Sequence, residues 1–194
     1  LVADTRKPIV FDPDLRVLHF MSVTNGATLG SIVGWANHPE TPWGKNTEIT
    51  ADFCGVLRDV LERGVTHEGK VLAAGVGGIH LYVNGAVGGL MTTHPSVTVR
   101  DPYLQQEFKE PSHDKSRAVG HQLAARILPL LAATNSAATD SAATDIAPIG
   151  IRARTMEMPI DNKLFLAAAY LGLIDRGHGH WKRMRCRFSR AASA

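Results

Sequence analysis

The stretch RVLHFMSVTNGATLGSIVGWANHP, residues 16–39, decides the fold of the first part of the chain. Two strand-like runs, Arg16 to Val23 and Thr28 to Trp35, flank the turn Thr24-Asn25-Gly26-Ala27. An Asn-Gly pair between such runs is a strong signal for a β-hairpin. We predict a hairpin whose second strand ends at His38, because the following Pro39 cannot donate a hydrogen bond to a regular ladder.

An amphipathic helix is predicted directly after this region. Apolar residues recur there at the spacing i, i+3, i+4, i+7, i+8, namely Phe53, Val56, Leu57, Val60 and Leu61. Thr50 or Asp52 is the predicted cap of this helix, and Gly64 is the predicted stop.

The remaining pattern alternates strands and helices. We expect a buried strand over Ile79 to Val83, a helix over Asp114 to Leu131, a strand over Ile149 to Met158 and a helix over Asn162 to Leu173. The inner face of the second helix is predicted to carry Val119, Leu123, Ile127 and Leu130 or Leu131. This order favours an α/β fold with a mixed β-sheet flanked by helices.

The distribution of charge argues against a nucleic-acid partner for the body of the chain. The formal net charge is +3, but six of the 21 basic residues follow Asp175, which leaves 15 basic against 18 acidic residues before that point. The basic end, residues 176–194, has no apolar period and is predicted to be a disordered tail. Residues 134–147 repeat Ser-Ala-Ala-Thr-Asp and are predicted to be a low-complexity loop.

Nine histidines are the first candidates for chemistry, and the surroundings of seven give them structural, surface or tail roles. These are His19 and His80 inside strands, His67 in a loop, His113 and His121 on a helix, and His178 and His180 in the tail. His38 stands where a strand ends, which is where ligands collect in α/β folds. Its imidazole makes a good zinc ligand that Asn37, Glu40 or Asp52 would orient.

A glycine-rich segment, Asn84 to Thr93, precedes the other candidate, His94. It matches neither the phosphate loop nor the dinucleotide fingerprint. Two interpretations remain open: a tight turn that holds Thr92, Thr93 and His94 near a substrate, or close packing of the backbone over small residues.

Three segments in this order resemble the catalytic N-terminal domain of the neutral/alkaline non-lysosomal ceramidase family. They are Asp4-Thr5-Arg6-Lys7-Pro8 with the strand Leu15 to Phe20, then Trp35 to Glu40 continuing to Ile49-Thr50-Ala51-Asp52-Phe53-Cys54-Gly55, and then Tyr82 to Gly89. The resemblance covers residues 1–175 and implies an incomplete domain, a truncated part of a longer one.

The resemblance implies a zinc-dependent amidase of sphingolipid metabolism, which hydrolyses the amide bond of ceramide or a related N-acyl lipid. His38 matches a zinc-ligating histidine of that family, and Arg6 matches an active-site arginine. The family's catalytic serine is replaced here by Met91, so Thr92 takes its place as the candidate hydroxyl. The family's other zinc ligands, a histidine upstream and a glutamate and a tyrosine downstream, would fall outside these 194 residues.

The same resemblance implies a lipid or lipid-like partner, contact with a membrane surface and a secreted or extracytoplasmic location. The alternative from another class is a catalytically inactive fragment or a lipid-binding module without chemistry. A catalytic zinc normally takes three protein ligands, and the sequence assigns only His38, which favours this alternative.

Overall fold

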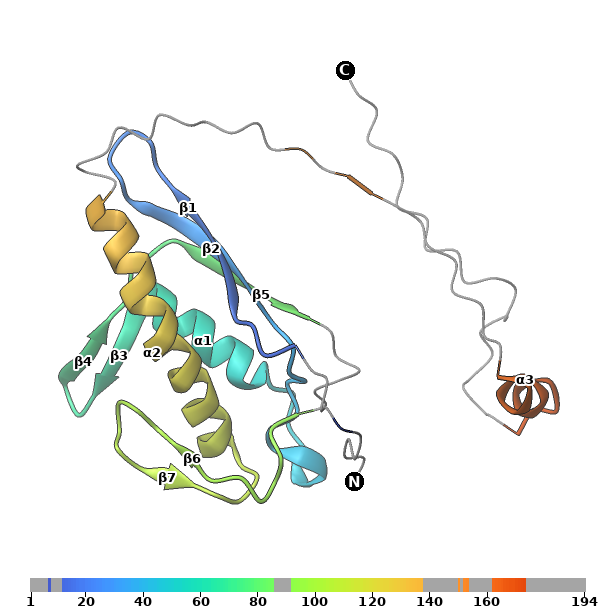
Figure 1. Cartoon of the computed structure of the whole chain (residues 1–194). Coiled ribbons are helices and arrows are strands. Elements are labelled where there is room, and N and C mark those ends of the chain that lie inside the picture. Colours follow the sequence, from blue (N-terminus) through green and yellow to red (C-terminus); the bar gives the residue numbers. More distant parts are fainter. Residues whose placement is uncertain are drawn as a thin grey trace. The chain divides into compact units, whose positions relative to one another are not determined.

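The computed structural model describes residues 7, 12–85, 92–137, 150, 152–153 and 162–173. The chain divides into two compact units, residues 1–144 and residues 145–194, each of which is described by itself (Figure 1). The first unit contains the strands β1 (Arg16–Met21), β2 (Thr28–Trp35), β3 (Gly64–His67), β4 (Lys70–Ala74), β5 (Ile79–Asn84), β6 (Val99–Arg100) and β7 (Glu107–Phe108). Its helices are the 3-10 turn η1 (Trp43–Lys45), α1 (Asp52–Arg63) and α2 (His113–Ala137), and the second unit contains α3 (Lys163–Tyr170).

A mixed three-stranded sheet organises the first unit, with the strand order β1-β2-β5. β1 and β2 form the predicted antiparallel hairpin, and β5 adds to β2 in parallel. With α1 and α2 beside it, this sheet confirms the predicted α/β class (Figure 1). β2 ends at Trp35 rather than at the predicted His38, because the backbone N–H of Asn37 donates to the side chain of Asn84 and not to a strand backbone.

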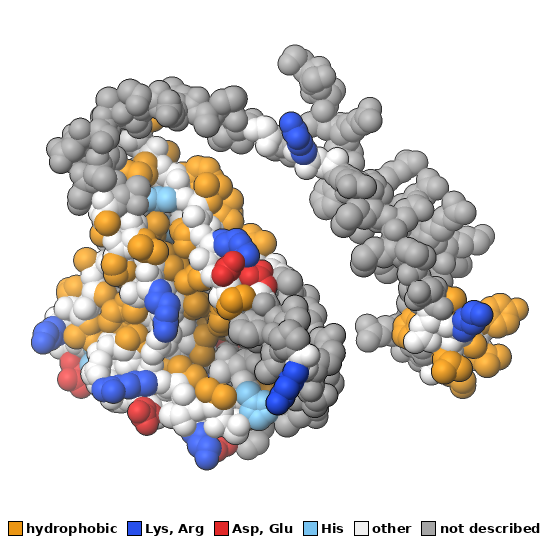
Figure 2. Space-filling model, in the orientation of Figure 1, with side chains coloured by type: hydrophobic (Ala, Val, Ile, Leu, Met, Phe, Trp, Pro, Cys, Tyr) orange, Lys and Arg blue, Asp and Glu red, His pale blue; other side chains and the backbone are white. Residues whose placement is uncertain are grey.

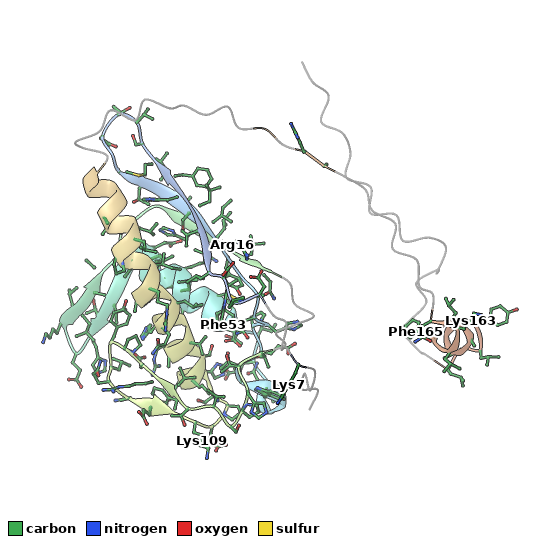
Figure 3. All side chains as sticks on the ribbon, in the orientation of Figure 1. Lys7, Arg16, Phe53, Lys109, Lys163 and Phe165 are labelled. Carbon is green, nitrogen blue, oxygen red and sulfur yellow. The ribbon has the colours of Figure 1, made fainter. Side chains whose placement is uncertain are left out.

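The core lies between one face of the sheet and the two helices. Val17, Val33 and Tyr82 share that face in register, and Phe53 of α1 packs against it (Figure 3). The Phe53 ring meets the ring of Tyr82 edge to face with centroids 5.5 Å apart, a favoured aromatic geometry. The predicted helix is thus confirmed as α1, which ends at Arg63 before Gly64, whose φ is 85°. Its N-cap is Ala51 and not the predicted Thr50 or Asp52, because Asp52 is already the first residue of the helix.

A close crossing joins α1 to α2. A side chain at Gly120 would place its Cβ 2.6 Å from the Val56 side chain and 2.9 Å from the Phe53 carbonyl oxygen. Only glycine therefore fits at this crossing. The apolar face of α2 that the sequence predicted is buried: Val119, Leu123, Ile127 and Leu131.

The second helix resolves one alternative that the sequence left open, and it ends later than predicted. Of the two alternatives for its last inner position, Leu131 is buried and Leu130 is 62% exposed. α2 continues to Ala137, so it includes the first four residues of the expected 134–147 loop. Residues 138–147 lie outside the described part.

Two short hairpins were not predicted. β3 pairs with β4 through the turn Glu68-Gly69, where both residues have positive φ, and β6 pairs with β7. His67, which the sequence assigned to a loop, is the last residue of β3. The turn has the backbone that favours hairpins, which the pair Glu-Gly signals more weakly than Asn-Gly.

The other face of the sheet carries an exposed apolar surface. Leu18, Phe20, Ile79, Leu81 and Val83 lie on it and are 38 to 71% exposed. Sheets with parallel pairs normally have both faces covered. The domain is therefore incomplete on this side, as the sequence predicted.

The second unit contains one described helix. In α3, the Asn162 side-chain oxygen accepts the backbone N–H groups of Leu164 and Phe165, which caps the predicted helix. Its apolar side chains are largely exposed (Figure 2). The predicted strand over 149–158 lies mostly outside the described residues, and the tail 176–194 lies wholly outside them. None of the described helices has the length and hydropathy needed to cross a bilayer.

Candidate functional site

The parallel pair β2–β5 brings the ends of two strands to one edge of the sheet. Gly34 pairs with Val83, and Trp35 pairs with Asn84, the last residue of β5. Both strands then leave the sheet at the same place (Figure 1). In α/β folds this carboxyl edge is where ligands bind, and here it carries Asn37 and His38.

β5 clamps the segment that leads to His38. The Tyr82 hydroxyl donates to the carbonyl oxygen of Trp35 at 2.8 Å and to that of Asn37 at 3.3 Å. The Asn84 side-chain oxygen accepts the N–H of Asn37 at 3.2 Å. Burial raises the pKa of Tyr82 well above its usual value, so its hydroxyl remains a donor at neutral pH. The backbone before His38 is therefore fixed on both sides.

The His38 imidazole has a carboxylate near one nitrogen and no partner among the described residues at the other. Its Nδ1 lies 3.6 Å from Glu40 Oε1, and its side chain is 24% exposed. Its Nε2 is buried and has no hydrogen-bond partner among the residues that the structure describes. A carboxylate at one ring nitrogen with a vacant second nitrogen is the arrangement typical of a metal-ligating histidine.

The turn after the glycine-rich segment returns to His38. The Thr92 hydroxyl donates to the His38 carbonyl oxygen at 3.2 Å, and the Trp43 indole N–H donates to the Thr93 carbonyl oxygen at 3.1 Å. The structure thus brings two of the predicted site residues, His38 and Thr92, into contact. The third, Arg6, lies outside the described residues, as do Met91 and most of the glycine-rich segment.

His94 does not join them in a side-chain contact. It is exposed, and its Nδ1 bonds to Ser96 Oγ at 2.7 Å. Its backbone is held by Lys115, whose fully buried ammonium donates to the carbonyl oxygens of His94, Pro95 and Lys109 at 3.1, 3.0 and 2.7 Å. Burial lowers the pKa of Lys115 from its usual value. Lys115 thereby fixes the turn that carries Thr92.

Asp52 ties the segment after His38 to both helices. Its carboxylate accepts the Thr41 N–H at 2.6 Å, the Phe53 N–H at 2.5 Å and the Ser116 hydroxyl at 2.5 Å. The residue is buried and has a φ of 50°, a backbone conformation that is unfavourable for residues other than glycine. Its backbone N–H in turn donates to Thr50 Oγ1 at 3.0 Å.

An open cleft begins at the residue after His38. Its volume is about 360 Å³, within the range of small-molecule sites. It is lined by both apolar and polar residues: Pro39, Glu40, Pro42, Trp43, Gly44, Asn46, Thr50 and Asp52.

Two buried histidine nitrogens, His38 Nε2 and His19 Nδ1, have no protein partner among the described residues. Within them, no group of three or more His, Cys, Asp or Glu side chains lies close enough together to hold a metal. Cys54 is near Asp52, but burial and then the Asp52 charge raise its pKa to about 12, so it is a thiol at neutral pH and a poor ligand. His38 Nε2 supplies a single position of a zinc site.

Two other histidines are structural, as their sequence surroundings suggested. His80 is fully buried between Ser31 Oγ, 2.7 Å from its Nδ1, and the Gly77 carbonyl oxygen, 2.8 Å from its Nε2. The buried His121 bonds to Asp101 Oδ2 at 2.7 Å. Burial lowers the pKa of His121 and outweighs the opposing effect of Asp101.

Comparison of the chain with protein-family models, with curated proteins and with solved structures gave no match. The assignment of this site therefore depends on the geometry of the structure alone. Sequence patterns missed the roles of Tyr82, Asn84 and Ser116, since each depends on a partner 45 to 64 residues away. The alternation in β5 and the polar Asn84 at its end are the only local signals that point to them.

Proposed function

We propose that the chain carries part of the catalytic domain of a zinc-dependent hydrolase of the ceramidase type, which cleaves the amide bond of ceramide or a related N-acyl lipid. One observation carries the proposal: a buried His38 Nε2 without a partner among the described residues, at the carboxyl edge of a parallel strand pair. The family resemblance in residues 1–175 supplies the reaction and the substrate class.

His38 would hold the zinc ion, with the remaining ligands supplied from outside the described residues. When bound, zinc lowers the pKa of a water to about 7 and polarises a carbonyl group. Glu40 next to Nδ1 keeps the ring oriented with Nε2 available. Arg6 would stabilise negative charge on the carbonyl oxygen or anchor a polar head group.

Thr92 is the hydroxyl proposed for the position of the family's serine. Its proton is engaged by the His38 carbonyl oxygen. To donate to a substrate, the hydroxyl must rotate away from that carbonyl.

A second candidate function is a lipid-binding module without chemistry, or an inactive fragment. The observation that favours it is that the described residues contain no group of three or more His, Cys, Asp or Glu side chains that could hold a metal. The cleft beside His38 and the exposed apolar face would serve a lipid-like ligand without any reaction.

Metal content distinguishes the two functions. We would measure zinc in the purified chain by elemental analysis, for the wild type and for His38→Ala, with His67→Ala as the matched control because its side chain is 51% exposed. About one zinc per chain, lost in His38→Ala and kept in His67→Ala, supports the hydrolase. Zinc absent from the wild type favours the second candidate, and zinc unchanged in His38→Ala contradicts the role of His38.

A further inference from the structure

A second buried polar group without a protein partner stands next to His38. Asn37 is 3% exposed, and its Nδ2 has no hydrogen-bond partner among the described residues. A buried amide donor without a hydrogen-bond partner lowers the free energy of unfolding by about 1–3 kcal/mol. Buried polar groups in native proteins are nearly always paired. This donor therefore calls for a partner outside the described part of the protein.

The backbone of Asn37 is fixed on both sides. Its N–H donates to Asn84 Oδ1, and its carbonyl oxygen accepts from the Tyr82 hydroxyl. Its predecessor Ala36 is buried, and a Cβ at Gly85 would lie 3.3 Å from it. Because this segment is packed and clamped, the carboxamide cannot reach water by a small shift of the chain.

The charge of the surroundings narrows the choice of partner. The acidic residues Glu40 and Asp52 are among those that line the neighbouring cleft, and no Lys or Arg is. An anionic ligand is disfavoured near two acids. A neutral acceptor oxygen suits both the uncharged NH₂ of Asn37 and these surroundings.

We propose that Asn37 Nδ2 donates a hydrogen bond to the carbonyl oxygen of an amide or ester ligand bound at His38. The inference rests on the proposed function, since it assigns Asn37 to the acyl group of the substrate. A donor that is fixed before the ligand arrives, in a site from which water is excluded, stabilises the charge that develops on a carbonyl oxygen during hydrolysis. Asn37 is then a residue that binds the reacting group and not a support for the His38 ring.

The first test is a binding measurement with octanamide as the probe and octanethioamide as the matched neutral ligand, in which sulfur, a poor acceptor, replaces the carbonyl oxygen. Calorimetric titrations would use the wild type, Asn37→Asp, Asn37→Leu and the control Asn25→Asp. Asn25 lies in the β1–β2 turn, where its Oδ1 accepts the Ala27 N–H, an acceptor that aspartate keeps. We expect octanamide binding to weaken at least tenfold in both Asn37 variants and to be unchanged in Asn25→Asp.

Octanethioamide and zinc separate this proposal from the metal role of His38. Octanethioamide binding should change less than twofold in Asn37→Leu, and the zinc content of that variant should equal that of the wild type. Octanamide binding within twofold of the wild type in Asn37→Leu would overturn the proposal, as would wild-type chain that binds octanamide no better than octanethioamide. Zinc absent from the wild type, by contrast, would speak only against the metal role of His38.

A spectroscopic readout excludes a purely structural effect. The infrared carbonyl stretch of bound ¹³C-labelled octanamide reports the hydrogen bond itself. We expect a lower frequency in the wild type and in Asn25→Asp than in Asn37→Leu. Equal frequencies would overturn the proposal. The melting temperature of the unliganded Asn37→Leu should not fall below that of the wild type, because the lost group had no partner to leave unpaired.

Discussion

Two histidines near opposite ends of the strand pair β2–β5 differ in how their ring nitrogens are bonded. At the amino end, Ser31 and His80 face each other in register, and both nitrogens of the His80 ring are bonded. At the carboxyl end, buried atoms of Asn37, His38 and Thr41 have no partner among the described residues. Both ring nitrogens of His80 are thus bonded within the fold, whereas Nε2 of His38 has no partner among the described residues.

The contrast separates stability from function within a single sheet. A buried and fully bonded group contributes to folding, whereas a buried unpaired one lowers stability until a ligand binds. Substitutions at the amino end should therefore lower stability strongly. Substitutions at the carboxyl end should change ligand binding with little loss of stability.

The largest expected effect is at His80. His80→Ala removes a fully buried ring and leaves Ser31 Oγ and the Gly77 carbonyl oxygen without their partner, so we expect a loss of about 3–4 kcal/mol in the free energy of unfolding. His38→Ala should cost less than about 1 kcal/mol, because its Nε2 has no protein partner in the described residues. Urea unfolding of both variants measures the difference, and equal losses would break the contrast between the two ends.

The next effect is at Asp52, which connects the carboxyl end to the helices. Asp52→Ala leaves Thr41 N–H, Phe53 N–H and Ser116 Oγ unpaired, and should cost about 2–3 kcal/mol. Ser116→Ala, which removes only one of these partners, should cost about 1 kcal/mol. If the two variants unfold at the same urea concentration, Asp52 does not act as the link between the three segments.

A smaller effect is expected at Lys115, which holds the turn after Thr92. Lys115→Met keeps the length of the buried side chain and leaves three carbonyl oxygens unpaired, at a cost of about 1–2 kcal/mol, because removing a buried charge offsets part of the loss. The exposed Lys109 gives the control Lys109→Met, which should be neutral. Thermal unfolding measures both. A neutral Lys115→Met would show that the turn is held by other contacts.

Local patterns predicted most of the fold, and longer-range pairing accounts for what they missed. The hairpin at Asn25-Gly26, α1 with its stop at Gly64, and the core face of α2 each follow from residues within one element. The hairpin β3–β4 was missed because Glu68 takes a left-handed φ that its residue type does not signal.

The candidate site was predictable only in part. His38 was found from its place between a strand and a proline, but its end of the sheet is built by β5, which joins β2 from 49 residues further along the chain. The donor role inferred for Asn37 depends on burial and on the clamp by Tyr82 and Asn84. Neither property can be derived from spacing along the sequence.

The smallest effect concerns His19, on the strand next to Ser31. Burial, and then the neighbouring His80, lower the pKa of His19, so the folded state favours the neutral ring. The unfolded chain therefore binds the proton more readily. The stability from neutral His19 is fully present above its ordinary pKa of about 6.5 and is lost as the pH falls through the lower folded-state pKa.

Between pH 7 and pH 5, the unfolding midpoint of the wild type should fall more than that of His19→Gln, while the exposed control His67→Gln should follow the wild type. Parallel curves for His19→Gln and the wild type would assign the acid sensitivity to other groups, of which His121, with its pKa also lowered by burial, is the first to examine.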